Sequence, residues 1–121
     1  MKSGFLKFIS IVFTCILILG CSTTYKTLTA QMPDLELKTD GTYRGNYDLS
    51  GTPVNVVLDV TVQNHKISEI GIVKHFCSPI GKKGEKIINK IIDAQNLNVD
   101  VISGATASSK AIIKAVENAL Q

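Results

Sequence analysis

Hydrophobic residues recur along the chain with two spacings, and each spacing predicts a different kind of element. Every second residue from 54 to 62 is apolar, which is the period of a strand that buries one face. Between residues 107 and 120 the apolar positions instead recur at helical spacing, on one face. They are residues 107, 111, 112, 115, 116, 119 and 120. A similar stripe of Ile87, Ile88, Ile91 and Ile92 predicts an earlier helix over about residues 81–94, with a late start because Gly81 and Gly84 weaken its first turn.

The segments around the alternating stretch predict further strands. Asp40-Gly41 leads into residues 42–47, where two tyrosines share a face and Gly45 between them allows a close approach. Residues 63–66 predict a hairpin loop, in which His65 is expected to be solvated, and residues 67–73 predict the next strand. The broken alternation near residues 69–72 indicates a bulge or burial on both faces.

A short buried strand is also expected from Val99, Val101 and Ile102. Because short loops join neighbouring strands, the economical arrangement is an antiparallel meander. The predicted fold class is therefore α+β: a single small domain with an antiparallel sheet of three or more strands and two helices packed on it.

The first residues have the pattern of an export signal. Lys2 and Lys7 precede an apolar run over residues 8–19, which is shorter than a membrane span requires. The run ends at Ile18-Leu19-Gly20-Cys21, which resembles a bacterial lipobox and implies cleavage before Cys21 and lipidation of its thiol. A plain secretory signal and an uncleaved anchor are the alternatives.

These signals predict three regions. Residues 1–20 are the lipoprotein signal peptide, residues 21–39 a tether that includes helix-breaking Pro33, and residues 40–121 the folded domain. Two acyl chains hold a protein firmly at a membrane, so the expected location is the extracytoplasmic face of a bacterial membrane.

Charge excludes one class of partner. The whole chain has 13 lysine and arginine residues and 10 aspartate and glutamate residues, which gives a net charge of +3. Cleavage removes two lysines and no acidic residue, so the net charge of the mature protein is +1. With no basic stripe and few aromatic residues, the chain does not fit nucleic-acid binding.

The cysteines leave no pair for an intramolecular disulfide in the mature domain. Cys15 leaves with the signal, Cys21 carries lipid, and Cys77 remains. His75, Cys77 and His65 have weak spacing for zinc, so no metal site is expected. Cys77 is either a small apolar residue or a thiol near a redox group.

Hydroxyl groups crowd the stretch before the final helix. Ser103, Thr106, Ser108 and Ser109 lie within seven residues, where serine and threonine commonly cap helices. Gly104 is free to take a positive φ. Free N–H groups at the start of a helix attract phosphate, so this stretch is either a phosphate site or only a polar loop with a cap.

Asp100-Val101-Ile102-Ser103-Gly104-Ala105-Thr106 resembles the flavinylation motif of the FMN-binding domain family. The family includes the C subunit of the sodium-pumping NADH:quinone reductase and many small surface lipoproteins. The resemblance extends over about residues 40–120. It implies that a flavin transferase takes FMN from FAD and joins its phosphate to Thr106, with Asp100, Ser103, Gly104 and Ala105 completing the motif.

A second family segment, usually His-x-Glu-Thr-Pro-Gly, resembles residues 75–80. His75 and Pro79 match, Ser78 stands in for threonine, Cys77 replaces the acid and Ile80 replaces the glycine. The resemblance implies flavin contacts from His75, Cys77, Ser78 and Pro79. From the residues alone, His75 is equally an exposed strand end, and Ser78-Pro79 is a helix start. The lysines at 82, 83, 86 and 90 form a solvated face, with one lysine near the flavin phosphate as the alternative.

These features predict an electron carrier that is not an enzyme by itself. Its cofactor is covalent FMN, and its partners are the flavin transferase and membrane redox proteins, with the domain itself monomeric. The alternatives are an unflavinylated surface lipoprotein that binds a ligand or scaffolds a complex, and a reductase with noncovalent FMN.

Overall fold

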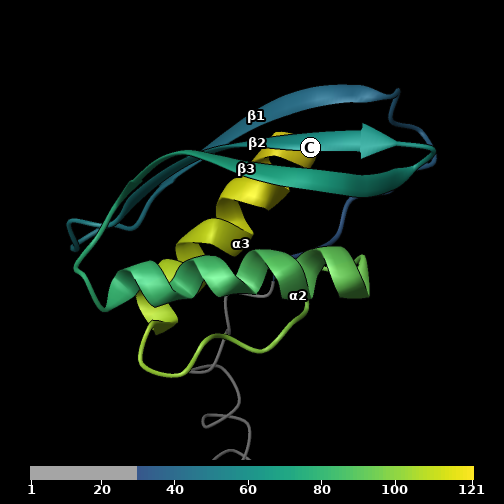
Figure 1. The fold of residues 1–121 in the computed structure, drawn as a ribbon. Coiled ribbons are helices and arrows are strands. Elements are labelled where there is room, and N and C mark those ends of the chain that lie inside the picture. The colour runs from purple at the N-terminus through teal and green to yellow at the C-terminus, as the bar shows by residue number, and fades with distance from the viewer. Residues whose placement is uncertain (1–29) are drawn as a thin grey trace, which may run out of the picture.

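The computed structural model describes residues 30–121, which form a two-layer α+β domain. A three-stranded sheet forms one layer, and the helices pack against one of its faces (Figure 1). This confirms the predicted fold class. The signal peptide, Cys21 and the beginning of the predicted tether lie outside the described residues.

The sheet is an antiparallel meander in chain order. Its strands are β1 (Gly41–Asp48), β2 (Asn55–Gln63) and β3 (Lys66–Phe76), with β2 in the centre. The register pairs Gly45 with Leu58 across β1 and β2, and Val60 with Ile70 across β2 and β3. A two-residue loop joins β2 to β3, and both of its residues have positive φ, as tight hairpin turns with right-handed twist require.

The irregularity expected in β3 is present at two places. The pairing with β2 shifts between Val57 and Leu58 and again between Thr61 and Val62, so β3 carries an extra residue at each point. These shifts flank the stretch in which the apolar alternation breaks down. His65, in the hairpin loop, is exposed as expected and places Nδ1 3.0 Å from the carbonyl oxygen of Leu35.

The core lies between the sheet and the helices. Alternate side chains of the central strand and of the residue just before it supply its floor and are at most 7% exposed, as the apolar alternation predicts: Val54, Val56, Leu58, Val60 and Val62. The other face of the sheet carries polar contacts such as the Arg44–Asp59 ion pair, with Nε 2.8 Å from Oδ1. Period-two patterning therefore separates a buried face from an exposed one.

The first helical segment has two parts. A 3₁₀ helix, η1 (Gly81–Lys86), leads into α2 (Ile87–Ala94), which agrees with the late start expected for the α-helix. The Ser78 hydroxyl accepts a hydrogen bond from the Gly81 N–H at 3.1 Å, so Ser78 does cap this segment. Ile87 and Ile91 are fully buried, while Ile88 and Ile92 are partly exposed.

The final helix, α3 (Thr106–Leu120), lies under the sheet and contacts β1, β2 and η1 (Figure 1). It approaches β1 so closely that a Cβ atom on Gly45 would overlap with the carbonyl oxygen of Ala115. The close approach expected at Gly45 is thus confirmed. The expected apolar face is buried from residue 111 onward, but Ala107 is exposed. Buried serines take its place in the first turn.

One expectation is wrong. No strand forms at residues 99–102, which run as an irregular loop. The Ile102 N–H donates to the Ser109 hydroxyl and the Ile102 carbonyl oxygen accepts from the Ala105 N–H, so neither group pairs with a strand. The described end of the predicted tether, residues 30–39, packs on the domain and does not extend from it. Leu35 is 8% exposed, and the Lys38 ammonium donates to the carbonyl oxygen of Leu120 at 2.6 Å.

The packed N-terminal segment also holds Glu117, a buried carboxylate on α3. Its oxygens accept hydrogen bonds from the Gln31 N–H at 3.1 Å and from the Lys114 ammonium at 2.6 Å. Burial by itself raises the pKa of Glu117, but the hydrogen bonds from Lys114 and Gln31 outweigh it and leave the pKa below its ordinary value of 4.5.

We expect the Glu117 carboxylate to make the stability of the domain depend on pH under acidic conditions. A carboxyl group with a lowered pKa in the fold stabilises it above the unfolded pKa, and this contribution is lost as the pH falls from about 4.5 through the folded value. Glu117→Gln should therefore flatten the acid side of a plot of urea midpoint against pH. The same exchange at exposed Glu69 serves as the control, and an equal flattening there would contradict the assignment.

No helix within residues 30–121 has the length and apolar character needed to cross a bilayer.

Candidate functional site

The loop before α3 is a tight turn with an open outer side. The Ala105 N–H donates to the Ile102 carbonyl oxygen at 3.0 Å, and Gly104 has φ +80°, the value that a type II turn requires at its third position. A Cβ atom on Gly104 would meet nothing within 4 Å. The positive φ expected at Gly104 is confirmed, and the turn leaves space above it for a ligand.

Ser109 joins this loop to the helix. Its hydroxyl accepts a hydrogen bond from the Ile102 N–H at 3.1 Å and donates one to the Ala105 carbonyl oxygen at 2.8 Å. Ser109 is fully buried, so these two bonds are shielded from water. They hold the loop in one conformation and fix where α3 begins.

Two of the four hydroxyl groups that crowd this stretch are not accessible to a ligand. Ser108 and Ser109 point into the domain, at 2% and 0% exposure, because α3 turns these positions toward the loop and η1. No side chain caps α3, whose N-cap residue is Ala105. Ser103 and Thr106 remain exposed, so only these two hydroxyls are accessible at the start of the helix.

Thr106 is the first residue of α3. Within the described residues its hydroxyl makes no hydrogen bond, and it lies where the positive end of the helix dipole favours an anion. Asp100 is also exposed, and its carbonyl oxygen is 3.4 Å from the Lys90 ammonium. The sequence motif is thus a surface feature that another protein can reach.

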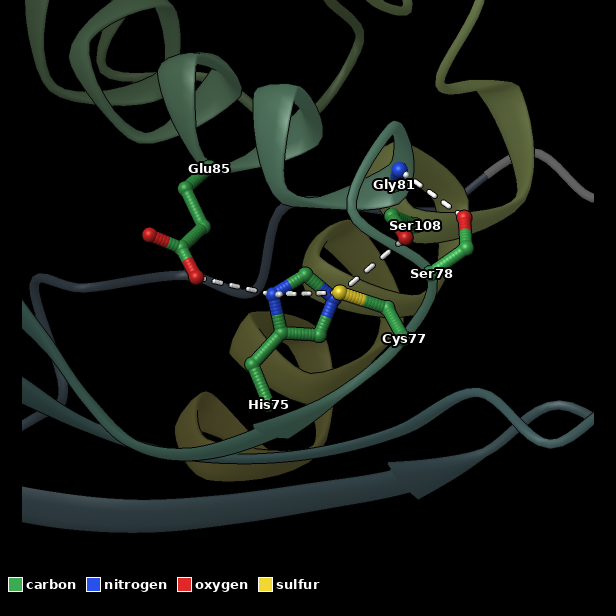
Figure 2. A network of polar contacts seen from close by, with 6 residues as sticks. All are labelled: His75, Cys77, Ser78, Gly81, Glu85 and Ser108. Atoms are coloured by element: carbon green, nitrogen blue, oxygen red, sulfur yellow. Dashed lines mark hydrogen bonds and ion pairs between the residues drawn. The ribbon is translucent and has the colours of Figure 1, made fainter.

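The second predicted segment centres on a buried histidine. The His75 side chain is 2% exposed and bridges three elements (Figure 2). Its Nδ1 lies 2.9 Å from a carboxylate oxygen of Glu85 in η1, and its Nε2 lies 3.3 Å from the hydroxyl of Ser108 in α3. The alternative that His75 is an exposed strand end is therefore wrong.

Cys77 lies beside this imidazole. Its Sγ is 3.7 Å from His75 Nδ1, and the residue is partly exposed (Figure 2). Cys77, Ser78, Pro79 and Lys82 line an open groove of about 500 Å³ beside β3. The groove has a mixed lining, with Ile72 and Val73 beside Lys82 and Glu85, and His75 is also among its lining residues.

Two glycines allow η1 to lie on the first turn of α3. A Cβ atom on Gly81 would come within 2.7 Å of the Ser108 hydroxyl oxygen, and one on Gly84 within 2.8 Å of the Ser108 Cβ. The sequence indicated only that these glycines weaken a helix. Their spacing of three, repeated on one face of a 3₁₀ turn, is the signal of close packing that sequence analysis missed.

We expect His75→Ala to destabilise the domain by about 2 kcal/mol, because the change leaves Ser108 without its buried partner and opens a cavity. Urea unfolding of the wild type and the variant measures this free energy. His65→Asn is the matched control, since residue 65 is exposed and asparagine tolerates its positive φ. Equal losses in both variants would contradict a bridging role for His75.

Within residues 30–121 no three histidine, cysteine, aspartate or glutamate side chains are grouped closely enough to hold a metal ion. The described site thus consists of an exposed threonine on an open turn, supported by buried serines and a bridging histidine.

Comparison with known proteins identifies the family. The model of the FMN-binding domain matches residues 50–121, which is more than half of the chain. A curated relative, the NADH:acrylate oxidoreductase of Vibrio harveyi, is 42% identical over 64 residues. That match covers 53% of this chain but only 6% of the much longer relative. The matched residues contain both the open turn at Thr106 and the groove at His75. The chain belongs to the FMN-binding domain family.

Proposed function

We propose that this chain is a lipid-anchored electron carrier on the extracytoplasmic face of a bacterial membrane, with FMN held as a phosphoester on Thr106. The observation that carries the proposal is the exposed Thr106 hydroxyl at the first turn of α3, within a domain of the FMN-binding family. The membrane part of the proposal rests on the lipobox at Cys21 in the sequence.

The donor set around Thr106 fits a flavin phosphate. The open turn at Gly104 leaves room for the phosphate, and the start of α3 supplies N–H groups and the positive end of its dipole. Lys110 lies one helical turn further along and adds a positive charge. In the proposed attachment, the Thr106 oxygen attacks the FMN phosphorus of FAD, the bond to AMP breaks, and AMP leaves as the hydroxyl proton is lost.

Bound FMN supplies a ring that accepts and donates one or two electrons, while this chain's own residues hold and orient it. Ser109 keeps the turn in one conformation, and His75 holds the first turn of α3 against η1. These contacts make the attachment point rigid. A rigid point is an advantage for a carrier, because it limits where the ring can meet a partner.

The named relative supports a redox role of some kind, since it is an oxidoreductase. Because so little of the relative is matched, neither its electron donor nor its substrate is assigned to this chain. We therefore propose that donor and acceptor sites lie on separate proteins, and that this domain moves electrons between them.

The deciding measurement is the intact mass of the exported protein from cells with and without a flavin transferase. We expect an increase by the mass of FMN less one water only where the transferase is present. A mass explained by amino acids and lipid alone, in cells that contain the transferase, would contradict the proposal and favour the unflavinylated binding module. Colour that is lost on unfolding would instead favour noncovalent FMN.

A further inference from the structure

A small apolar cavity lies where the described part of the chain begins. Its volume is about 160 Å³, and its walls come from the end of β1, the loop before α3 and α3 itself. Ala30, the first described residue, belongs to this wall and lies on the helix side of the sheet (Figure 1). The apolar part of the wall also includes Tyr47, Leu49, Leu97, Val99, Val101 and Ile113. Neither Thr106 nor His75 lines it, so the cavity is separate from the site described above.

The size of the cavity suits one apolar side chain. A cavity of about 150 Å³ with apolar walls stays free of water and takes up a guest the size of benzene. The volume here is close to that value and below the roughly 300–1,000 Å³ of sites that enclose drug-sized ligands. A single leucine side chain therefore fits the cavity, and a large cofactor does not.

The chain beside the cavity alternates in a way that directs such a side chain toward it. Ala30 and Met32 are partly buried against the core, whereas Gln31 between them is exposed, and its N–H donates to the Glu117 carboxylate at 3.1 Å. In an extended chain, residues two apart point to the same side. Leu28 is therefore in phase with Ala30 and Met32, and it precedes Ala30 by only about 7 Å of extended chain.

The rest of the preceding segment offers a poorer occupant. Apart from Leu28, the one large apolar side chain among residues 22–29 is that of Tyr25, and the others are serine, threonine and lysine. Tyr25 is out of phase with Ala30 by the same alternation, and its hydroxyl would need a hydrogen-bond partner once buried. Leu28 is thus the side chain that both reaches the cavity and matches its apolar walls.

We propose that Leu28 occupies this cavity and docks the segment before Ala30 onto the domain. The free part of the tether then shortens to residues 22–27, and Leu28 lies at most about 25 Å of extended chain from Cys21. A tether of this length holds the domain next to the membrane, with the side around Ala30 turned toward it. This consequence rests on the proposed lipid anchor at Cys21, whereas the docking itself requires neither lipid nor FMN.

Trypsin reports the docking, because it cleaves after Lys26, two residues before Leu28. A protease cleaves the undocked form, so the rate follows the fraction of molecules in which Leu28 is out of the cavity. In the full mature chain, Leu28→Asn should raise the rate of cleavage at Lys26 about tenfold, followed by mass spectrometry over time. Leu37→Asn is the matched control, since Leu37 is 87% exposed, and it should leave the rate unchanged. Short peptides with the two sequences correct for any direct effect of residue 28 on trypsin.

A change in the cavity wall separates docking from other effects of the substitution. Val101→Asn places a polar group in the wall and leaves the cleaved sequence intact, and it should also raise the rate about tenfold. The double variant should stay near tenfold, well below the roughly hundredfold of independent effects, because either change alone releases Leu28. Val73→Asn, at a half-exposed valine of β3, is the control for this exchange and should have no effect.

The proposal can fail in three ways. An unchanged rate in Leu28→Asn after the peptide correction would overturn it, and this result decides alone if circular dichroism shows that Val101→Asn does not fold. A hundredfold increase in the double variant would also overturn it. Faster cleavage in Tyr25→Asn but not in Leu28→Asn would assign the cavity to Tyr25 instead. A mature protein that carries no FMN by mass would remove the proposed function and leave the docking of Leu28 in place.

Discussion

Thr106→Ala is expected to abolish covalent flavin completely. Alanine has no hydroxyl, so no phosphoester can form at the first residue of α3, whatever the affinity of the domain for FMN. Coexpression with a flavin transferase, followed by denaturation and intact-mass measurement, should give an unmodified chain. The fold should survive, because Thr106 is exposed and its side chain makes no hydrogen bond with any residue in the described part of the chain.

Ser103→Ala is the matched control for this experiment. Ser103 is the other exposed hydroxyl of the same loop, so its loss changes local polarity without removing the proposed attachment oxygen. We expect the control to be flavinylated, at full or reduced yield. Thr106→Ser should also accept FMN, since it keeps the oxygen. Retained FMN in Thr106→Ala, or its loss only in Ser103→Ala, would move the attachment to another residue.

Gly45→Ala is expected to cause the largest loss of stability of any single methyl addition in the sheet. The new Cβ would overlap with the backbone carbonyl oxygen of Ala115 and lie 2.8 Å from the Cβ of Ala119. A backbone atom in the middle of α3 cannot rotate away, so the helix must move off the sheet. Overpacking typically costs 1–3 kcal/mol, and we expect about 3 kcal/mol or more here.

For a domain of this size, such a change lowers the thermal midpoint by more than about 10 °C. Circular dichroism during heating measures it. Gly71→Ala in β3 is the control: its Cβ would meet nothing within 4 Å, so the variant should be neutral or slightly more stable. A midpoint for Gly45→Ala close to that of the control would show that α3 and β1 do not pack as closely as described.

The strand and helix pattern was predictable because it is local. Each side chain of β2 faces up or down by its position alone, so alternating valines identify the buried face without knowledge of the partner strands. The close approach at Gly45 was predictable for a similar reason, since a glycine between two tyrosines on one face marks a missing side chain.

The site was only partly predictable. The motif identified Thr106 and Gly104, but it did not separate the accessible hydroxyls from the buried ones at Ser108 and Ser109. That distinction depends on which side of α3 meets η1, and η1 comes from a segment more than twenty residues earlier. The burial of His75 was open for the same reason, because its partners, Glu85 and Ser108, lie on two other elements.

The sequence by itself thus determined the class of fold, the position of the motif and the family to which the chain is similar, since these depend on periodicity and on short runs of residue types. Only the tertiary structure decided that residues 30–39 pack on the domain, that residues 99–102 form no strand, and that Ser108 and Ser109 are buried while Thr106 is exposed. The physical reason is that burial of a polar or irregular segment depends on hydrogen-bond partners brought together from distant parts of the chain, and no local pattern of residues encodes them.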